Sequence, residues 1–518
     1  MAQLPRVFTG IVLLFMAGVL IAQAAQSLQW RLVVDTPQLA YMAYLIEQLR
    51  YVPYRDFFDL NIPGIFAVYA LVGKVSGYSD FGFRIADLAY VSALLIVTAS
   101  WMVRFGRLVA ISAVTLFGLL YMSCGAYMTL QRDALELLPI ACAVLVLTTH
   151  RPIDQRLRAI LIGLFFGCAA TLKPHALVGL PVLMAYQLIA VWRDHRGGPS
   201  RPRSLMAVAG AAALGCLVPL SAAALILWYL GALDQFLDMA SNYWPIYQSI
   251  SGRFEALGGF SDQLFSALKG FMTSGSARFL VILVPGVLGL YIALYQSTLD
   301  ESAKSLARIV AALGVAYAGY ALFAGKFFLY HMILFGYFAV LLAAMCLVEQ
   351  RNSPGPSQSL FPVLVLFVVM AVACRPAPEF TSWLAGRSYS SPRVERADEI
   401  AAYLKANLKP ADTVQALDVI EGGTHAMLLA RARPATPFLL DIVFYHRMSD
   451  PYVAKLRREF IAALESARPR FILELDHFGI IGQGSDSTTE FPELTSFIHA
   501  NYRLAQSGSG YRIYAKVQ

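Results

Sequence analysis

Charged residues are scarce in this chain. Only 14% of its 518 residues are Asp, Glu, Lys or Arg, whereas 58% are hydrophobic, and the mean hydropathy is +0.58. Soluble domains carry about 25% charged residues, so the composition excludes an ordinary soluble protein. Apolar runs recur from Val7 to Cys374. The sequence therefore predicts a polytopic α-helical membrane protein.

Signatures of nucleotide and nucleic-acid binding are also missing. The sequence has neither a G-x-G-x-x-G nor a P-loop pattern. Its net charge of +8 comes from basic residues in short gaps between apolar runs, as the positive-inside rule predicts, and not from a basic stripe with interleaved aromatics. We therefore expect the lipid bilayer as a partner and no nucleic acid.

Cysteines are few and do not form the pattern of a disulfide framework. All six lie in or at the ends of apolar runs, so the sequence predicts neither disulfides nor a C-x-x-C metal site. The polar C-terminal segment has none. Together with the short loops, this favours a bacterial inner (plasma) membrane.

Stretches of about 20 apolar residues are long enough to cross the hydrocarbon core. We expect about eleven such helices. They lie near residues 8–29, 81–103, 108–124, 134–149, 159–172, 175–192, 205–231, 278–297, 306–324, 328–349 and 359–374.

The basic gaps at 150–158 and 193–204 set the predicted topology. If both are cytoplasmic, the N-terminus lies inside and the C-terminus lies outside. The motif Lys173-Pro174-His175 divides the apolar stretch 159–192, because proline removes a backbone donor and a charge within the bilayer is expensive. If that stretch is one helix, the predicted membrane orientation of every later segment is reversed.

The composition changes after Cys374. Amphipathic segments predict helices at 395–407, 451–466 and 491–501, and alternating segments predict strands at 413–418, 470–475 and 510–517. We therefore expect a membrane domain over residues 1–376, which includes an outer loop at 30–80 with interfacial helices. A soluble α/β domain over 390–518 is expected to be extracytoplasmic, that is, periplasmic.

The outer loop begins with an acidic residue. Asp35 precedes Leu39, Met42 and Ile46, whose helical spacing predicts an amphipathic helix on the membrane surface. Asp35 is a candidate functional carboxylate. The alternative is a helix cap, since Gln38 follows three residues later.

The second half of the loop reads RDFFDLNIPG. It places Asp56, Asp59 and Asn61 close together. Carboxylate and amide oxygens bind hard divalent cations, so Asp56 and Asp59 are candidate metal ligands, and a divalent cation is left open as a cofactor. The alternative is that these groups satisfy a turn.

These features resemble the GT-C superfamily of polyprenyl-phosphate-sugar-dependent glycosyltransferases. The most similar members are the family-39-like enzymes, which include protein O-mannosyltransferases and lipid A aminoarabinose transferase. The motifs that carry the resemblance are Asp35, RDFFDLNIPG, Arg84, the QRD segment at Arg132, Lys173, and KFFLYH at His331. The resemblance implies transfer of a sugar from a polyprenyl-phosphate donor to an extracytoplasmic acceptor, which can be a lipid, a glycan or a protein. It implies Asp35 as the base.

A lipid-phosphate leaving group needs cations. The candidates are Arg132, Lys173, Lys326 and His331, which all lie at predicted outer helix ends. Each has an alternative. Lys326 can snorkel, Arg132 can pair with Asp133 or Glu136 in its own helix, and His331 can be a core histidine.

Other residues have predicted supporting roles. Arg84 is expected to pair with Asp87 and hold the first loop. Tyr247 and Arg253 in the 232–277 loop can contact a sugar or cover a cavity, although an interfacial aromatic belt is the preferred interpretation of the aromatics. Two other functions remain open: a transporter or flippase, and a ligase that uses a polyprenyl-diphosphate glycan.

Overall fold

A computed structural model of the protein describes residues 4–149, 153–194, 201–250, 261, 265, 269, 278–324, 328–350, 360–477, 481 and 486–517. The chain divides into two compact units. Unit 1 comprises Met1–Trp30, Arg84–Ala223 and Ala267–Arg387. Unit 2 comprises Arg31–Phe83, Ala224–Ser266 and Ser388–Gln518.

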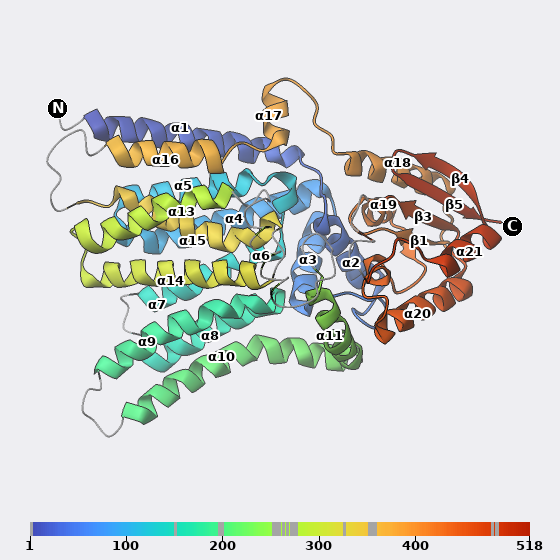
Figure 1. The fold of residues 1–518 in the computed structure, drawn as a ribbon, viewed down its shortest axis with the longest axis horizontal. Coiled ribbons are helices and arrows are strands. Elements are labelled where there is room, and N and C mark those ends of the chain that lie inside the picture. Colours follow the sequence, from blue (N-terminus) through green and yellow to red (C-terminus); the bar gives the residue numbers. More distant parts are fainter. Residues whose placement is uncertain are drawn as a thin grey trace. The chain divides into compact units, whose positions relative to one another are not determined.

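Unit 1 is a bundle of helices, most of which lie side by side (Figure 1). Its elements are α1 (Leu4–Gln26), α4 (Asp80–Met102), α5 (Arg107–Met122), α6 (Arg132–Leu135), α7 (Leu137–Thr148), α8 (Gln155–Leu172), α9 (Leu180–Asp194), α10 (Arg201–Tyr229), α13 (Arg278–Tyr291), α14 (Glu301–Ala324), α15 (Ile333–Ala344), α16 (Leu360–Ala373) and α17 (Pro378–Leu384). The first residues of α4 and the last residues of α10 are assigned to unit 2. Helix α15 packs against α5, α13 and α14. The apolar stretch that contains it, Leu329–Leu347, is 89% buried, so it forms the centre of the bundle.

The predicted count of eleven spans is not confirmed. Each of the eleven predicted segments contains a helix, but only seven helices in the described parts of the chain are long and apolar enough to cross a bilayer. The count is eight if α16 and α17, which are bent by 95°, form one broken span. Helices α5 and α7 have 16 and 12 residues, fewer than the roughly 20 that a span needs. Helix α14 begins with a charged stretch that includes Glu301, Lys304 and Arg308.

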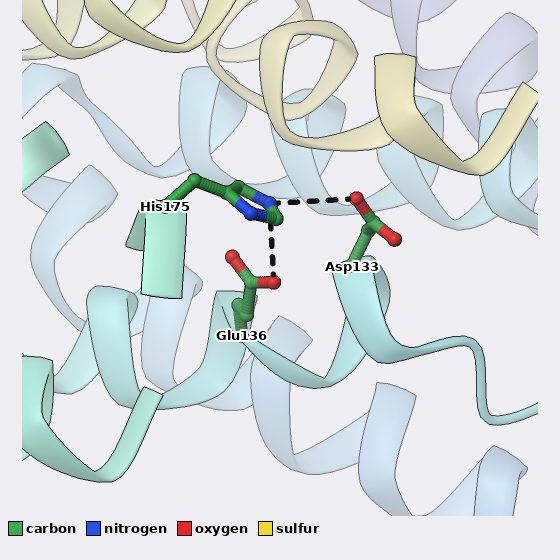
Figure 2. A group of neighbouring side chains, drawn as sticks. All are labelled: Asp133, Glu136 and His175. Atoms are coloured by element: carbon green, nitrogen blue, oxygen red, sulfur yellow. Dashed lines mark ion pairs between the residues drawn. The ribbon is translucent and has the colours of Figure 1, made fainter. Parts of the chain in front are cut away.

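The predicted break at Lys173-Pro174-His175 is confirmed. Helix α8 ends at Leu172, Lys173 has an extended backbone (φ −160°, ψ 126°), and a 3-10 turn, η4 (Pro174–Gly179), leads into α9. Because proline cannot continue the hydrogen-bond ladder of α8, the chain turns here. His175, which follows the break, is directed toward Asp133 and Glu136 (Figure 2).

Unit 2 contains a five-stranded sheet. Its C-terminal part comprises α18 (Pro392–Asn407), β1 (Thr413–Leu417), α19 (Gly423–Ala430), β2 (Arg433–Pro434), α20 (Pro451–Ala467), β3 (Phe471–Leu475), α21 (Pro492–Asn501), β4 (Tyr502–Gly508) and β5 (Tyr511–Lys516). The strand order is β2-β1-β3-β5-β4. Strand β1 is parallel to β2 and β3, and β5 is antiparallel to β3 and β4. The small α/β architecture is as predicted, although α19, β2 and β4 were not.

The predicted outer loop also belongs to unit 2. It contains α2 (Asp35–Leu49) and α3 (Pro63–Ser76), and unit 2 further includes α11 (Leu233–Gln248). Helix α2 packs against α3 and α19. Every residue from Thr36 to Leu45 is buried, so protein covers all faces of this part of α2, whereas Ile46 to Leu49 are half-buried or exposed. The expected position of the helix on the membrane surface stays a prediction.

Candidate functional site

A buried cluster of ionisable side chains forms where α6 meets the α8–α9 break. Asp133 lies in α6, and Glu136 follows α6 directly. Residues three apart on a helix share one face, so both carboxylates point the same way. Lys173 and His175 come from the extended residue and the 3-10 turn after α8.

The four side chains lie close together. Lys173 Nζ is 2.7 Å from Asp133 Oδ1. His175 Nε2 lies between the two carboxylates, 3.6 Å from Asp133 Oδ1 and 3.4 Å from Glu136 Oε1 (Figure 2). Asp133 and Glu136 are fully buried, and the side chains of Lys173 and His175 are only 15% and 11% exposed. The cluster is therefore an interior site with limited access.

Positive charge balances these carboxylates. Burial raises the pKa of Asp133, but the charges of Lys173 and His331 outweigh burial and hold that pKa below its ordinary value. The charge of Arg132 acts on Lys173 and Glu136. Three of the four predicted phosphate-binding cations, Arg132, Lys173 and His331, are thus brought together around one acidic pair.

Aromatic rings surround the cluster. The ring of Tyr320 stacks on His175 with parallel planes and centroids 3.6 Å apart. Lys173 Nζ lies 5.9 Å from the ring centroids of both Tyr320 and Tyr330. His331 is 6% exposed and packs edge-on against Tyr330, 4.5 Å between centroids. These rings pack against both histidines and shield much of the lysine from water.

Several polar atoms of the cluster make no hydrogen bond within the described part of the chain. They are Asp133 Oδ2, both carboxylate oxygens of Glu136, and His175 Nε2. Leaving a buried polar atom unpaired costs about 1–3 kcal/mol. Several such atoms at one place therefore indicate a site where a ligand can bind.

Asp35 is the first residue of α2 and not its cap. The N-cap residue is Val34, which makes no side-chain cap hydrogen bond. Val34 has φ 61° and ψ −121°, a conformation that β-branched residues rarely adopt. Such strain concentrates at functional sites. The structure thus gives Asp35 a defined, half-buried position after a strained residue, and its predicted role as base stays a prediction.

The candidate metal ligands Asp56 and Asp59 are used by turns. Asp59 is 2% exposed, and its Oδ1 accepts hydrogen bonds from Asn61 N (2.8 Å) and Asn61 Nδ2 (2.6 Å). Asp56 accepts from Arg55 and from Val52 N (2.7 Å). The carboxylates face different partners, so this geometry supports the turn alternative.

Arg84 lies in a buried network that includes the predicted partner Asp87. Both side chains are 1% exposed. Arg84 also donates to Ser27 Oγ (2.9 Å), and Asp87 Oδ1 accepts from Leu130 N (2.7 Å). The pair therefore joins the end of α1 to the turn before α6, which positions Arg132 and Asp133.

The remaining predicted residues lie elsewhere. Tyr247 is half-buried in α11, a helix joined to the first loop by a hydrogen bond from Trp244 Nε1 to Leu60 O (3.0 Å). Lys326 and Arg253 lie outside the described residues.

Asp133, Glu136 and His175 are the site residues that the sequence analysis missed. Two signals pointed to them. Asp133 and Glu136 have the spacing of one helix face, and His175 directly follows the Lys-Pro break in an apolar stretch. Assigning Asp133 and Glu136 as partners for Arg132 hid the first signal, because Asp133 pairs instead with Lys173 across the bundle.

Comparison with known proteins gives matches only through structure. No protein-family model and no curated protein matches this sequence. The chain is similar to a crystal structure of ArnT from Cupriavidus metallidurans bound to undecaprenyl phosphate, with a TM-score of 0.58, 13% sequence identity and coverage of 98% of each chain. ArnT of the same organism in the apo state gives a TM-score of 0.45 and 14% identity over 99% of this chain and 98% of that chain. This protein therefore has a fold like that of ArnT over nearly its whole length.

Proposed function

We propose that this protein is a GT-C glycosyltransferase of the membrane. It moves a sugar from a polyprenyl-phosphate donor to an extracytoplasmic acceptor. The observation that carries the proposal is the ArnT fold over 98% of the chain, because that ArnT structure holds undecaprenyl phosphate. The cluster around Lys173 and Asp133 supports it, since it supplies the cations that a phosphate leaving group needs.

The proposed chemistry is one displacement at the anomeric carbon. The acceptor's oxygen or nitrogen forms the new bond to C1 while the bond from C1 to the phosphate oxygen breaks, so the configuration inverts. The phosphate leaves as an anion and needs no general acid. Lys173, Arg132 and His331 stabilise the developing negative charge, and Arg132 offers two parallel donors to phosphate.

Asp35 is the proposed base. The attacking hydroxyl or amine loses its proton, and a carboxylate within hydrogen-bond reach accepts it. The strained Val34 before it supports a functional position for Asp35. Asp56, Asp59, Asn61 and Arg84 are assigned to structuring the loop and the turn before α6, and Tyr247 stays a candidate sugar contact.

The proposed setting is the bacterial inner membrane. The seven to eight candidate spans support a multi-pass membrane protein. The sheet-containing part of unit 2 is then periplasmic, where lipid-linked sugars are available and nucleotide sugars are not. The sugar and the acceptor are not assigned.

Donor consumption tests this function. Purified full-length protein is given radiolabelled polyprenyl-monophosphate and polyprenyl-diphosphate sugars, together with envelope lipids and glycans as acceptors. We expect release of polyprenyl phosphate by the native protein and at least a hundredfold loss for Asp35→Asn and Lys173→Ala, whereas Lys74→Ala, an exposed lysine of α3, retains activity. Consumption of the diphosphate donor alone would indicate a ligase. Transport of lipid across vesicles with no donor consumed would replace the proposal with a flippase.

A further inference from the structure

We propose that Asp133, Glu136 and His175 bind a divalent transition-metal ion. Each offers one ligand atom, and these three atoms lie within 4.8 Å of one another. Among the residues that the structure describes, this is the one group of three His, Cys, Asp or Glu side chains with such spacing. The first loop, where the sequence suggested a metal, does not supply one.

The distances fit an ion better than they fit hydrogen bonds. Good N–H···O hydrogen bonds span about 2.7–3.2 Å, but His175 Nε2 lies 3.4 Å from Glu136 Oε1 and 3.6 Å from Asp133 Oδ1. Metal–ligand bonds of about 2.0–2.2 Å in a tetrahedral site put neighbouring ligand atoms about 3.3–3.6 Å apart. The two distances from His175 Nε2 therefore match the separation of ligand atoms around a shared ion.

Glu136 gives independent support. Its side chain is fully buried, yet neither carboxylate oxygen accepts a hydrogen bond within the described part of the chain. The carboxylate points toward the imidazole of His175 (Figure 2). Burial of polar oxygens without hydrogen bonds is unfavourable, and a metal ion would bind these oxygens directly.

The ligand set selects the kind of metal. Two carboxylates and one imidazole suit Zn²⁺ or Mn²⁺ better than Mg²⁺ or Ca²⁺, which prefer oxygen ligands alone. Stacking on Tyr320 holds the His175 ring in place. Three protein ligands leave a fourth position for water or a substrate oxygen, as in catalytic zinc sites.

The charges suggest what the fourth position takes. Two carboxylates neutralise a divalent ion, so the charges of Lys173 and Arg132 remain available to an anion. We infer that the ion and Lys173 contact the donor phosphate together, the ion through one oxygen and the ammonium through another. This role rests on the proposed function, whereas binding of the metal does not.

Metal binding by the purified full-length protein tests the site. The protein is stripped with EDTA, titrated with Co²⁺ and followed by its visible absorption, and Zn²⁺ content is measured after reloading. We expect about one ion per chain in a tetrahedral environment, and at least tenfold weaker binding by Glu136→Gln and by His175→Gln. Two exposed residues provide matched controls, Glu301→Gln and His499→Gln, which should bind as the native protein does.

Two outcomes would overturn the inference. One is a native protein that binds neither Co²⁺ nor Zn²⁺ and whose thermal unfolding does not shift on adding either ion. The other is metal retained at native affinity by both site variants. If a variant does not fold, the thermal shift of the native protein with Zn²⁺ decides the question alone. Donor consumption without metal binding refutes only the metal site, and metal binding without donor consumption refutes only the proposed function.

Discussion

Two acidic regions of this protein differ in how their carboxylates are used. In the first loop, Asp59 accepts two hydrogen bonds from Asn61, and Asp56 binds Arg55 and a backbone amide. In the bundle, Glu136 is more deeply buried yet accepts none in the described part of the chain. Acidic residues close together in sequence therefore do not by themselves indicate a site. Buried carboxylate oxygens that lack hydrogen bonds are the better indicator.

The largest expected effect comes from breaking the ion pair of the cluster. Asp133→Asn leaves the Lys173 ammonium in a buried place without its carboxylate partner, 2.7 Å away in the native protein. Removing one partner of a buried pair costs about 3–5 kcal/mol. We expect the melting temperature and transfer both to fall sharply, as measured by thermal unfolding and donor turnover.

The double variant Asp133→Asn with Lys173→Met is the control. It removes both charges, so it should recover most of the stability and none of the activity. Equal stability of the single and double variants would mean that the pair is not coupled.

Glu136→Gln should separate stability from function. In metal-free protein this change replaces a buried carboxyl group that accepts no hydrogen bond in the described part of the chain with an amide of the same shape, so we expect the free energy of unfolding to change by less than about 1.5 kcal/mol. Transfer should nevertheless fall at least tenfold. Denaturant unfolding in EDTA and single-turnover kinetics measure the two effects. A destabilised but active variant would show that Glu136 is a structural residue.

Asp59→Ala should have the opposite signature. It leaves the amide and side chain of Asn61 without their acceptor, which costs about 1–3 kcal/mol. We expect a lower melting temperature with unchanged metal content and transfer within a few-fold of native. Asp59→Asn keeps an acceptor oxygen and should be milder. Loss of bound metal in Asp59→Ala would move the metal site to the first loop.

The smallest effect is expected at Asp56, which is partly exposed. The hydrogen bond from Arg55 holds the pKa of Asp56 below its ordinary value. A lowered folded-state pKa stabilises the fold above the unfolded pKa, and this stabilisation disappears as pH falls through the folded pKa. Asp56→Asn should therefore cost about 0.5 kcal/mol near pH 7 and nothing in strong acid. A stability difference that grows on acidification would contradict this sign.

Periodicity and composition predicted much of the fold. Helical segments, the break at Lys173 and most of the α/β elements follow from apolar patterns and from proline. The number of membrane spans could not be predicted from these patterns. Helices α5 and α7 are apolar but short, and hydropathy alone does not distinguish such helices from membrane spans. The burial of α2 depends on contacts with α19, nearly four hundred residues away in the sequence.

The site was predicted only in part. The sequence analysis selected Lys173, Arg132 and His331 because ionisable residues within apolar segments are costly to bury and are usually functional. Their convergence on Asp133 and Glu136 depends on tertiary packing of α6, η4 and the 3-10 turn Leu329–Met332. No local pattern encodes that packing, so the acids that complete the cluster were seen only as neighbours of Arg132.

Binding of undecaprenyl phosphate to the purified protein tests the central claim most directly. The claim is that the Lys173 cluster holds a lipid phosphate. A charge-assisted hydrogen bond is worth about 1.5–3 kcal/mol, so Lys173→Gln should weaken binding about tenfold to a hundredfold, while Lys74→Gln should leave it unchanged. Equal affinity of the native protein and the folded Lys173→Gln variant would contradict the account.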